Sequence, residues 1–389
     1  MKMNVCYITV IDRVIKYFVY PHINAMIEEG NEVTCISNFS DINALDNING
    51  DIATIQLEIE RNVDPINLIS CIFRMYRIFR AGKYDVIQYT GPSTALICSI
   101  AGCLAHIPVR QYCLWGIRYE GFNKGLKRRV FRLLEKISCK LSTHIILDSE
   151  NNRKFAVEEK LLSFEKSTVI GLGSACGVDL SEYDITKKEE YRNEVLDRWH
   201  INRNAFVFGY VGRLSAEKGF NELLRASMKL ISNVDNVVLL LVGFEENNSG
   251  IDSQLLIEAK KTDRIIFCGR VDAPQQYYAA MDVFVFPSYR EGYGGGCVQA
   301  GAFAVPSIVS DIRPLMDAIQ EGKYGEYFKL GDWYGLYEKM YLLYSRKDLL
   351  KKYGEKMYSR VKENFEMEAW KTLYKQHMER ITGKKHEEN

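Results

Sequence analysis

Metal-site and redox motifs are absent from this sequence. Its ten cysteines are scattered singly, with no C-x-x-C pair and no zinc-like spacing. Isolated cysteines of this kind are typical of buried thiols in a reducing compartment. Residues 1–14 run directly into a strand pattern, without the apolar core and cleavage site of a secretory signal. We therefore expect a cytoplasmic protein.

Long uncharged apolar runs are missing as well. The longest candidate, residues 91–109, is rich in small side chains and contains His106. It predicts a buried helix, because a membrane span needs about 18 or more consecutive apolar residues. There is no Walker A loop, and no recognised nucleic-acid-binding motif is present. We therefore expect no nucleic-acid partner.

What the chain does contain is enough apolar material for two cores. It has 389 residues, 47% of them hydrophobic, and a chain of this length normally divides into two domains. The net charge of +1 is unevenly spread, since residues 61–140 hold 14 Lys and Arg against four Asp and Glu. This basic segment favours an anionic partner, either a phosphate-rich ligand or lipid headgroups.

Short apolar runs alternate with helical patterns along the chain, which predicts βα units and parallel sheets. The runs are apolar throughout, as expected for strands covered by helices on both faces. The predicted strands are residues 5–10, 32–37, 52–59, 85–90, 109–115, 144–149, 167–173, 205–212, 236–243, 264–269, 282–288 and 306–310. We expect an α/β fold with two doubly wound, Rossmann-like sheets and a cleft between them.

The polar stretch 177–204 separates the two series of strands and predicts a linker with one charged helix. We place the domain boundary near residue 180, which gives an N-terminal domain of residues 1–180 and a C-terminal domain of residues 181–365. The chain after residue 331 is predicted to be helical to about residue 382. Ligands of such folds bind at the carboxyl ends of strands, so the loops there are the candidate sites.

The loop after the predicted strand 205–212 carries two cations beside a helix start. Gly212 begins a turn, and Arg213 and Lys218 flank it. A helix N-terminus favours an anion and two cations would neutralise it, so the loop fits a diphosphate. The alternative is a surface loop whose Lys and Arg are simply solvated.

A glycine-rich stretch, PSYREGYGGGCVQAG (287–301), follows the predicted strand 282–288. Glu291 stands before Gly292, Gly294, Gly295 and Gly296, and a helix is predicted from about Cys297. Bare backbone at a helix start lets a phosphate or sugar approach the N–H groups. A dinucleotide fingerprint is disfavoured, because the sixth position of G-x-G-x-x-G, counted from Gly292, is Cys297.

Two further strand ends contribute candidates. Arg270 and Val271 follow the predicted strand 264–269, and a loop of this kind can hold a nucleobase by backbone groups. Residues 111–125 are rich in aromatics and glycine and include Trp115 and Glu120. They either line the cleft from the first domain or pack aromatic rings beneath a loop.

Two basic segments, residues 71–83 and 124–140, have helical patterns. Arg74, Arg77 and Arg80 form one stripe of the first, and the second has seven Lys and Arg beside a broad apolar face. Basic amphipathic helices of this sort lie on anionic membrane surfaces. The alternative is a core-facing helix with a solvated basic back.

Taken together, these loops resemble the retaining, nucleotide-sugar-dependent glycosyltransferases of family four, which have the GT-B fold. The resemblance is carried by GRLSAEKG (212–219), PSYREGYG (287–294) and GVD (177–179), and residues 135–150 are similar as well. Residues 298–312 look most like bacterial enzymes that build capsule or O-antigen. The resemblance also implies that a closing helix, residues 366–382, crosses back to the N-terminal domain.

The resemblance implies roles for particular residues. Arg213 and Lys218 would hold the donor diphosphate and stabilise the charge that develops as the nucleotide leaves. Glu291 would contact the sugar hydroxyls, and the backbone of Gly292, Tyr293, Gly294 and Gly295 would wrap the sugar and phosphate. Val271, beside Arg270, would meet the base, and position 299 would bind the ribose.

Three features depart from the family pattern. Gln299 stands where a glutamate is usual, although an amide can accept from one ribose hydroxyl and donate to the other. Trp115 stands where relatives often have histidine. The first loop, residues 10–17, lacks the usual glycine pair and offers Arg13 and Lys16 instead. The candidate acceptor contacts are Arg13, Lys16, Trp115 and Glu120.

The activity implied is a retaining, hexosyltransferase-type transfer from a nucleotide sugar, with UDP as the default nucleotide. The acceptor would be a saccharide on polyprenyl diphosphate at the inner face of the cell membrane. No cofactor and no metal are expected, because the nucleotide sugar is a co-substrate and cations hold its phosphates. The alternatives are a sugar-nucleotide epimerase on the same fold and a non-catalytic relative, which Gln299 and Trp115 would support.

Overall fold

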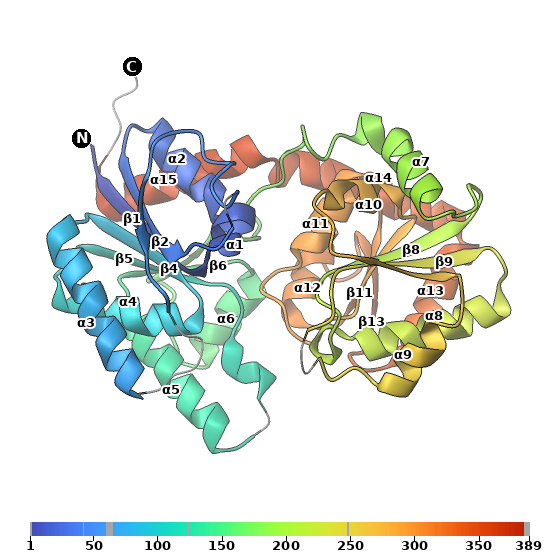
Figure 1. Ribbon diagram of the computed structural model, residues 1–389, viewed down its shortest axis with the longest axis horizontal. Helices are drawn as coiled ribbons and strands as arrows, with labels where there is room; N and C mark the ends of the chain where they lie inside the picture. Colours follow the sequence, from blue (N-terminus) through green and yellow to red (C-terminus); the bar gives the residue numbers. More distant parts are fainter. Residues whose placement is uncertain (1, 42, 60–64, 123, 247–248, 385–389) are drawn as a thin grey trace. The chain divides into compact units, whose positions relative to one another are not determined.

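The computed structural model describes residues 2–41, 43–59, 65–122, 124–246 and 249–384. The chain divides into two compact units. Unit 1 contains Met1–Gly177 and Met367–Asn389, and unit 2 is Val178–Glu366. Each unit is built around one parallel sheet with helices on both faces (Figure 1). The predicted α/β class with two Rossmann-like sheets is therefore confirmed.

Unit 1 has seven parallel strands in the order β3-β2-β1-β4-β5-β6-β7. The strands are β1 (Asn4–Ile11), β2 (Glu32–Asn38), β3 (Ala53–Gln56), β4 (Val86–Thr90), β5 (Val109–Leu114), β6 (His144–Leu147) and β7 (Ser167–Val169). The chain leaves the centre in opposite directions from β1 and β4, which makes their carboxyl ends the topological switch point. Crevices at this point are the usual ligand sites of doubly wound folds.

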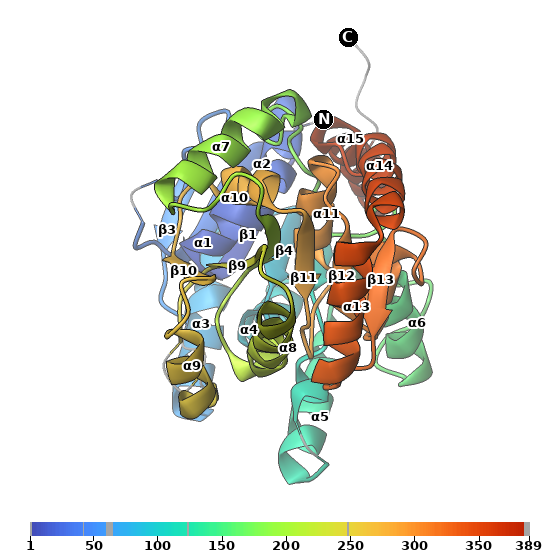
Figure 2. The same ribbon diagram turned by 90° about the vertical axis from the view of Figure 1, so that its right-hand side faces the viewer.

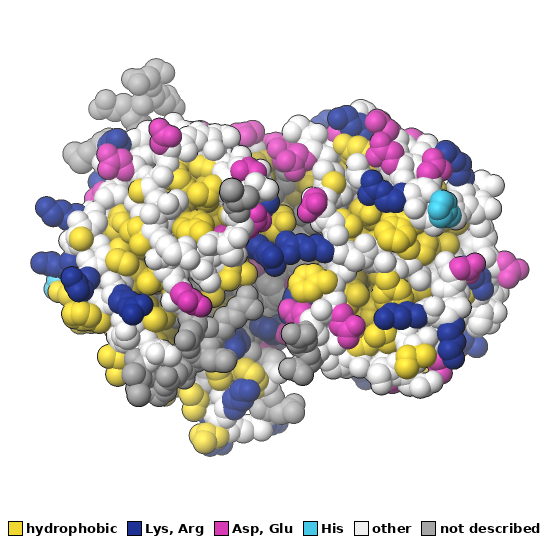
Figure 3. Space-filling view, in the orientation of Figure 1, with side chains coloured by type: hydrophobic (Ala, Val, Ile, Leu, Met, Phe, Trp, Pro, Cys, Tyr) yellow, Lys and Arg dark blue, Asp and Glu magenta, His cyan; other side chains and the backbone are white. Residues whose placement is uncertain are grey.

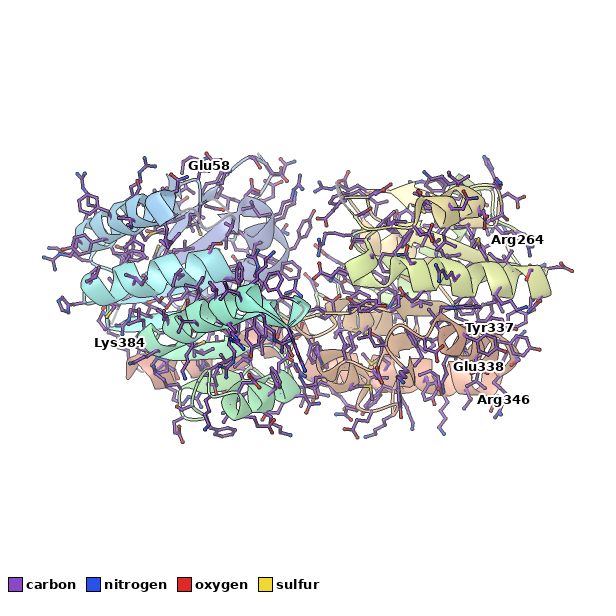
Figure 4. The ribbon with its side chains drawn as sticks, turned by 90° about the horizontal axis from the view of Figure 1, so that it is seen from below. Glu58, Arg264, Tyr337, Glu338, Arg346 and Lys384 are labelled. Carbon is purple, nitrogen blue, oxygen red and sulfur yellow. The ribbon has the colours of Figure 1, made fainter. Side chains whose placement is uncertain are left out.

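Helices cover both faces of the unit 1 sheet. On one face α3 (Pro65–Gly82), α4 (Pro92–Leu104) and α5 (Leu126–Leu141) lie side by side (Figure 4). The other face is covered by α2 (Tyr20–Glu28) and α15 (Met367–Thr382). Strand β1 serves both cores, because Cys6 and Ile8 face the first layer while Val5 and Tyr7 face the second. The shorter helical segments are α1 (Asp12–Val14), a π-helical turn at Ile15–Val19, a 3₁₀ turn at Arg118–Gly121 and α6 (Glu150–Glu158).

Helix α15 is held in unit 1 by buried contacts. Trp370, Tyr374 and Met378 are almost fully buried against the sheet. The Tyr374 hydroxyl donates to Gln88 Oε1 at 2.7 Å, and His377 Nε2 lies 2.7 Å from Gln111 Oε1. Beyond the helix, Lys384 pairs with Asp85 at 3.1 Å; Lys384 is labelled in Figure 4.

Unit 2 has six parallel strands in the order β10-β9-β8-β11-β12-β13. They are β8 (Phe206–Val211), β9 (Val237–Val242), β10 (Ile265–Gly269), β11 (Val283–Phe286), β12 (Ser307–Ser310) and β13 (Gly325–Phe328). Figure 2 brings β11, β12 and β13 to the front, side by side. Sequence analysis missed β13, because its GEYF sequence has no apolar run and its Tyr327 is exposed at the sheet edge.

One continuous core fills unit 2. Its helices are α7 (Lys188–Arg198), α8 (Phe220–Asn233), α9 (Ser253–Ala259), α10 (Pro274–Ala280), α11 (Gly295–Ala302), α12 (Arg313–Ile319), α13 (Trp333–Ser345) and α14 (Lys347–Asn364), with 3₁₀ turns at Ile185–Lys187 and Ala216–Lys218. The prediction of helix after residue 331 is confirmed by α13, α14 and α15. No helix in the described part of the chain is both long and apolar enough to cross a bilayer.

Candidate active site

The loop after β8 is anchored by a glycine that no other residue can replace without a shift. Gly219 ends the 3₁₀ turn Ala216–Lys218 with φ +69° and stands directly before α8. A Cβ at this position would lie 2.0 Å from the carbonyl oxygen of Pro287, which precedes the glycine-rich loop. Glycine therefore allows the loops after β8 and β11 to touch, backbone against backbone.

Side chains then tie these two loops together. Lys218 Nζ lies 2.6 Å from Glu291 Oε1, and each of these side chains is only 15% exposed. The backbone N–H of Tyr289 donates to the Glu217 carbonyl at 3.0 Å, and Arg290 Nη2 is 2.6 Å from Glu217 Oε1. The structure thus brings together Lys218 and Glu291, which the sequence placed 73 positions apart.

Arg213 is oriented by the loop after β9. Its Nη1 donates to Glu246 Oε2, and its own carbonyl accepts from the buried Tyr210 hydroxyl at 2.7 Å. The backbone N–H of Leu214 donates to the Phe244 carbonyl at 2.9 Å. Arg213 and Lys218 therefore both stand on the β8 loop, each with a carboxylate partner from a neighbouring loop.

The glycine-rich loop leads into α11, as predicted. Gly294 has φ +133°, and a Cβ there would lie 2.8 Å from the Leu315 side chain. The turn is therefore packed against α12 and leaves no room for a side chain at this position. Gly295, the first residue of α11, is exposed, and a Cβ added to it would meet open space. Gln299 is one helical turn later and half-buried, so it shares the Gly295 face of α11. Open backbone and an amide therefore share one side of this helix start.

Two other predicted donor contacts differ in their surroundings. The Tyr293 side chain is buried, with its ring 5.8 Å from the Phe365 ring and its hydroxyl 3.3 Å from Arg360 Nη2. Burial raises the pKa of Tyr293 well above its usual range. Only its backbone is thus left for a ligand. Arg270 is exposed and Val271 half-buried, directly after β10 and its left-handed Gly269.

Four of these loops meet at the carboxyl edge of the unit 2 sheet. The N–H of Gly212 donates to the Val242 carbonyl at 2.9 Å, and that of Gly243 donates to Gly269 at 2.8 Å. These bonds join the loops after β8, β9 and β10, while the ties between Lys218 and Glu291 add the loop after β11. Cations, open backbone and an amide therefore stand at the edge where doubly wound sheets bind their ligands.

Unit 1 carries a pocket of about 310 Å³ at the carboxyl ends of β1, β4 and β5. Its walls combine apolar and aromatic groups with a few polar ones. The lining residues are Val10, Ile11, Val14, Phe18, Thr90, Gly91, Pro92, Ser93, Tyr112, Trp115, Gly116 and Arg118. The Phe18 and Trp115 rings lie 6.0 Å apart, tilted by 56°. Such a wall suits the apolar faces and hydroxyl rims of a sugar.

Of the four predicted acceptor contacts, only Trp115 lines this pocket. Arg13 is exposed, and Lys16 Nζ is 3.4 Å from Asp41 Oδ2. Glu120 lies in the 3₁₀ turn Arg118–Gly121, half-buried. The first loop is built around Asp12 instead, whose carboxylate accepts from the N–H groups of Ser40, Asp41 and Arg13 at 2.5–2.8 Å. Burial raises the pKa of Asp12, but these backbone hydrogen bonds outweigh it and hold the pKa below its usual value.

A buried carboxyl lies behind the pocket wall. The Tyr112 hydroxyl donates to Glu135 Oε1 at 2.7 Å. Burial raises the pKa of Glu135 to about 7, although the Tyr112 hydrogen bond and the charge of Arg118 oppose this. Glu135 and Arg118 also line a smaller adjoining cavity. A carboxyl that titrates near neutrality therefore lies behind Tyr112, which separates it from the pocket.

Sequence analysis missed several of these groups for identifiable reasons. Glu246 follows a predicted strand, 236–243, but its loop carries no glycine run or cation cluster to mark it. Tyr112 and Arg118 belong to residues 111–125, which were predicted as a candidate loop, yet nothing in the sequence distinguishes them from their neighbours. Glu135 lies in the predicted basic helix 124–140, and its being the one acidic residue there could have indicated a buried role.

Among the described residues, no cluster of three or more His, Cys, Asp or Glu side chains has the geometry to hold a metal ion. The ten cysteines are free thiols, and several are fully buried. Burial raises the pKa of Cys35 to about 12, so this thiol stays protonated at neutral pH.

Comparison with known proteins gives consistent results for both units. Residues 4–149 match the family model "Glycosyl transferase 4-like", and residues 192–360 match "Glycosyl transferases group 1". The capsular polysaccharide biosynthesis glycosyltransferase CapM of Staphylococcus aureus is 29% identical over 320 residues, which are 82% of each chain. The UDP-Gal:alpha-D-GlcNAc-diphosphoundecaprenol alpha-1,3-galactosyltransferase of Escherichia coli is 27% identical over 65% of this chain and 64% of its own.

A solved glycosyltransferase of Rickettsia africae has the same fold, with a TM-score of 0.77 and 17% identity over 99% of this chain and 100% of its own. Two parallel-sheet units, each matched by a glycosyl transferase family model, define the protein as a glycosyltransferase with the GT-B fold. More particularly, the chain belongs to the family-four glycosyltransferases, because the two family models together span most of its length.

Proposed function

We propose that this glycosyltransferase moves a hexosyl group from a UDP-sugar to a saccharide carried on polyprenyl diphosphate, in the synthesis of a capsule or O-antigen polysaccharide. The observation that carries the donor half is the joined pair of loops after β8 and β11. It sets Arg213, Lys218 and Glu291 at one edge of the unit 2 sheet, beside the open start of α11. The named E. coli relative supports a UDP-sugar and a lipid-linked acceptor.

In the proposed donor complex, Arg213 and Lys218 bind the diphosphate. Lys218 then exchanges its contact with Glu291 for phosphate oxygens, which frees Glu291 to accept hydrogen bonds from the sugar hydroxyls. The N–H groups at Gly295 and Gly296 point to the same anion, and Gln299 on that face binds the ribose. Arg270 and the backbone at Val271 hold the base.

The proposed transfer retains the anomeric configuration. The bond from the anomeric carbon to the phosphate oxygen breaks, and both electrons leave with the nucleoside diphosphate. Arg213 and Lys218 stabilise this growing negative charge, which is the interaction that lowers the barrier. The acceptor hydroxyl attacks on the same face and gives its proton to the departing phosphate oxygen. Enzymes of this family typically need no metal, and we propose that the two cations carry that role.

For the acceptor, we assign the unit 1 pocket. Trp115 and Phe18 provide rings for the apolar face of a sugar, while Ser93 and Arg118 add polar groups to the lining. Arg13, Lys16 and Glu120 stand outside this pocket, so in this proposal they contact more distant parts of the acceptor.

A lipid-linked acceptor requires contact with a membrane, and α5 offers a surface for it. Leu126 is 77% and Leu133 58% exposed, and Val130 is exposed between them. Lys127, Arg129 and Lys136 stand on the same helix, and hydrophobic and basic side chains lie together where α5 ends at the bottom of Figure 3. Exposed apolar groups amid cations match an anionic lipid surface. The other basic segment, residues 71–83, lies on α3 as far as Gly82 and adds Phe73, which is exposed, beside Arg74 and Arg77.

The test is a thermal shift measurement with UDP, GDP, dTDP and ADP, followed by product analysis with the matching sugar nucleotides. A ligand at about 100 times its dissociation constant adds about 2.7 kcal/mol to the free energy of unfolding. We expect UDP to raise the melting temperature, and a retained glycosidic product to form with a lipid-linked saccharide. A shift with GDP alone would move the proposal to another nucleotide. A product that is only an epimerised sugar nucleotide would contradict glycosyl transfer.

A further inference from the structure

Glu246 is an anion at the proposed diphosphate site that the proposed donor complex does not use. Its Oε2 accepts from Arg213 Nη1, and both side chains are partly exposed. Lys218 also has a carboxylate partner, Glu291, but in the proposed complex Glu291 binds the hydroxyls of the donor sugar. Glu246 is different, because it neutralises Arg213 and contacts no part of the nucleotide sugar in that complex.

The contact is built into the backbone of two adjoining loops. Leu214 donates to the Phe244 carbonyl at 2.9 Å, and Leu214 and Glu245 form a β-bridge. A Cβ at Gly243, which has φ +144°, would lie 1.8 Å from the Gly212 carbonyl oxygen. The β8 and β9 loops are therefore packed without space between them. Arg213 and Glu246 are the chain neighbours of these packed backbone positions, so the backbone holds the two side chains close together.

A carboxylate and a phosphate compete for the same guanidinium. Both bind its N–H groups in the same planar, bidentate way, so an arginine held by one has fewer donors and less charge for the other. The pair between Arg213 and Glu246 is partly solvated, which makes it weak enough to open when a diphosphate arrives. A carboxylate that remains nearby also repels that diphosphate.

We infer that Glu246 acts as a competing anion for Arg213 and so sets the affinity for the nucleoside diphosphate. It weakens the binding of the donor and of the diphosphate product in the ground state. The Arg213 contact is then strongest when charge develops on the leaving group, and Glu246 recaptures Arg213 as the product departs. Glu246 is thus a positioning residue that limits product inhibition.

This inference rests on the proposed function, and its test measures nucleotide binding in the full chain. UDP affinity is determined by calorimetry for the wild type and for Glu246→Gln, which keeps the shape and removes the charge. We expect UDP to bind about 2- to 5-fold more tightly to Glu246→Gln, in keeping with the loss of one partly exposed ion pair. The inhibition constant of UDP against transfer should fall by the same factor, with an unchanged melting temperature.

The matched control is Glu245→Gln, the neighbouring exposed carboxylate, whose Oε1 accepts from Ser249 Oγ at 3.2 Å rather than from Arg213. We expect wild-type affinity in this variant. A second pair, Arg213→Met and Arg213→Met/Glu246→Gln, separates competition for Arg213 from simple repulsion. If Glu246 acts through Arg213, the gain from Glu246→Gln disappears in the Arg213→Met background.

Equal or weaker UDP binding by Glu246→Gln would overturn the inference and leave the proposed function standing. A gain of the same size without Arg213 would also overturn it, because it would show unspecific repulsion. Failure of the wild type to bind UDP, GDP, dTDP or ADP would instead overturn the proposed function, and this inference with it.

Discussion

At the scale of single residues, the ion pair of Lys218 and Glu291 gives the most direct test of the proposed donor site. Both side chains are largely buried, and their 2.6 Å contact leaves either charge uncompensated when the other is removed. We expect Lys218→Ala and Glu291→Ala to lower transfer about 100-fold or more, as when a transition-state donor is lost. Removing one partner of such a pair also costs about 1–3 kcal/mol of stability.

Both variants are measured by transfer rate and by melting temperature. The control is Lys339→Ala, which breaks a 2.7 Å ion pair with Glu326 elsewhere in unit 2. This variant should transfer at the wild-type rate. Near-normal transfer by Lys218→Ala or Glu291→Ala would remove that residue from the catalytic site.

Glu135 gives a prediction with a definite sign in pH. Its pKa rises from 4.5 in the unfolded chain to about 7 in the folded protein, chiefly through burial. The folded state therefore binds the proton more tightly, and the stability it provides is lost as pH rises from about 4.5 through about 7. Glu135→Gln keeps the acceptor for Tyr112 and removes this loss. We expect its melting temperature to exceed the wild type's by several degrees at pH 8, with the difference shrinking towards pH 5. Equal differences at both pH values would contradict the buried titration.

Single residues also show how far sequence reasoning reaches. The GRLSAEKG and PSYREGYG motifs carry Lys218 and Glu291 in fixed positions beside strand ends, and the structure brings the two side chains together, while their roles stay predictions. The pocket wall was not predictable, because Phe18 follows β1, whereas Tyr112 lies in β5 and Arg118 follows β5. The pairing of β4 with both β1 and β5 brings them together. Tyr293 shows the reverse case, since its place in a motif does not reveal that its ring turns into the core.

At the scale of secondary structure, α5 is the element whose role is open to direct test. Leu126→Asn/Leu133→Asn removes its two most exposed apolar side chains, and Arg129→Glu/Lys136→Glu reverses two of its cations. Each cation near an anionic surface contributes about 1 kcal/mol, so the charge variant should bind at least tenfold more weakly. The apolar variant should also bind more weakly, because its side chains no longer enter the lipid.

Binding is measured by flotation with vesicles of phosphatidylglycerol and phosphatidylcholine, against phosphatidylcholine alone. The control is Ile257→Asn, which removes a 54% exposed apolar side chain from α9 of unit 2. We expect this control to bind as the wild type does. Binding that ignores the charge of the lipid would reject α5 as the membrane surface.

Elements were mostly predictable because buried strands of a parallel sheet are uniform apolar runs. The run VVLLLV became β9, fully buried along its length. The edge strand β13 lacked that signal, since one side of an edge strand meets solvent and tolerates polar residues. The apolar face of α5 shows a different limit. Periodicity shows that a helix has such a face, but Leu126 and Leu133 point to solvent and only the structure reveals this.

At the scale of the whole molecule, buried histidines link its stability to acid. Burial lowers the pKa of His22 to about 4 and that of His377 to about 3, with the charges of Arg380, His144 and His22 adding to the effect at His377. Each histidine binds its proton less tightly when folded, so their contribution to stability is full above pH 6.5 and is lost as pH falls towards 4 and 3. We expect the melting temperature to drop steeply from pH 6.5 to 4.5.

His377→Gln tests this origin, because glutamine stays neutral and can still donate to Gln111. Its melting temperature should be lower than the wild type's at pH 7.5 but should fall less between pH 6.5 and 4.5. The comparison is made by calorimetry in buffers of constant ionic strength. An equally steep fall in this variant would mean that His377 plays no part in the acid response.

Helix α15 has a consequence for the way the protein is made. The sheet of unit 1 begins at residue 4, yet Trp370, Tyr374 and Met378 cover one of its faces. A ribosome must therefore synthesise all of unit 2 while that face is covered by α2 but not yet by α15, and residues 178–366 can complete their own core first. A chain truncated before α15 would leave part of this apolar face exposed to solvent, and chaperones and proteases recognise exposed apolar surface. Helix α15 thus completes the core of unit 1 only after the whole of unit 2 has been synthesised.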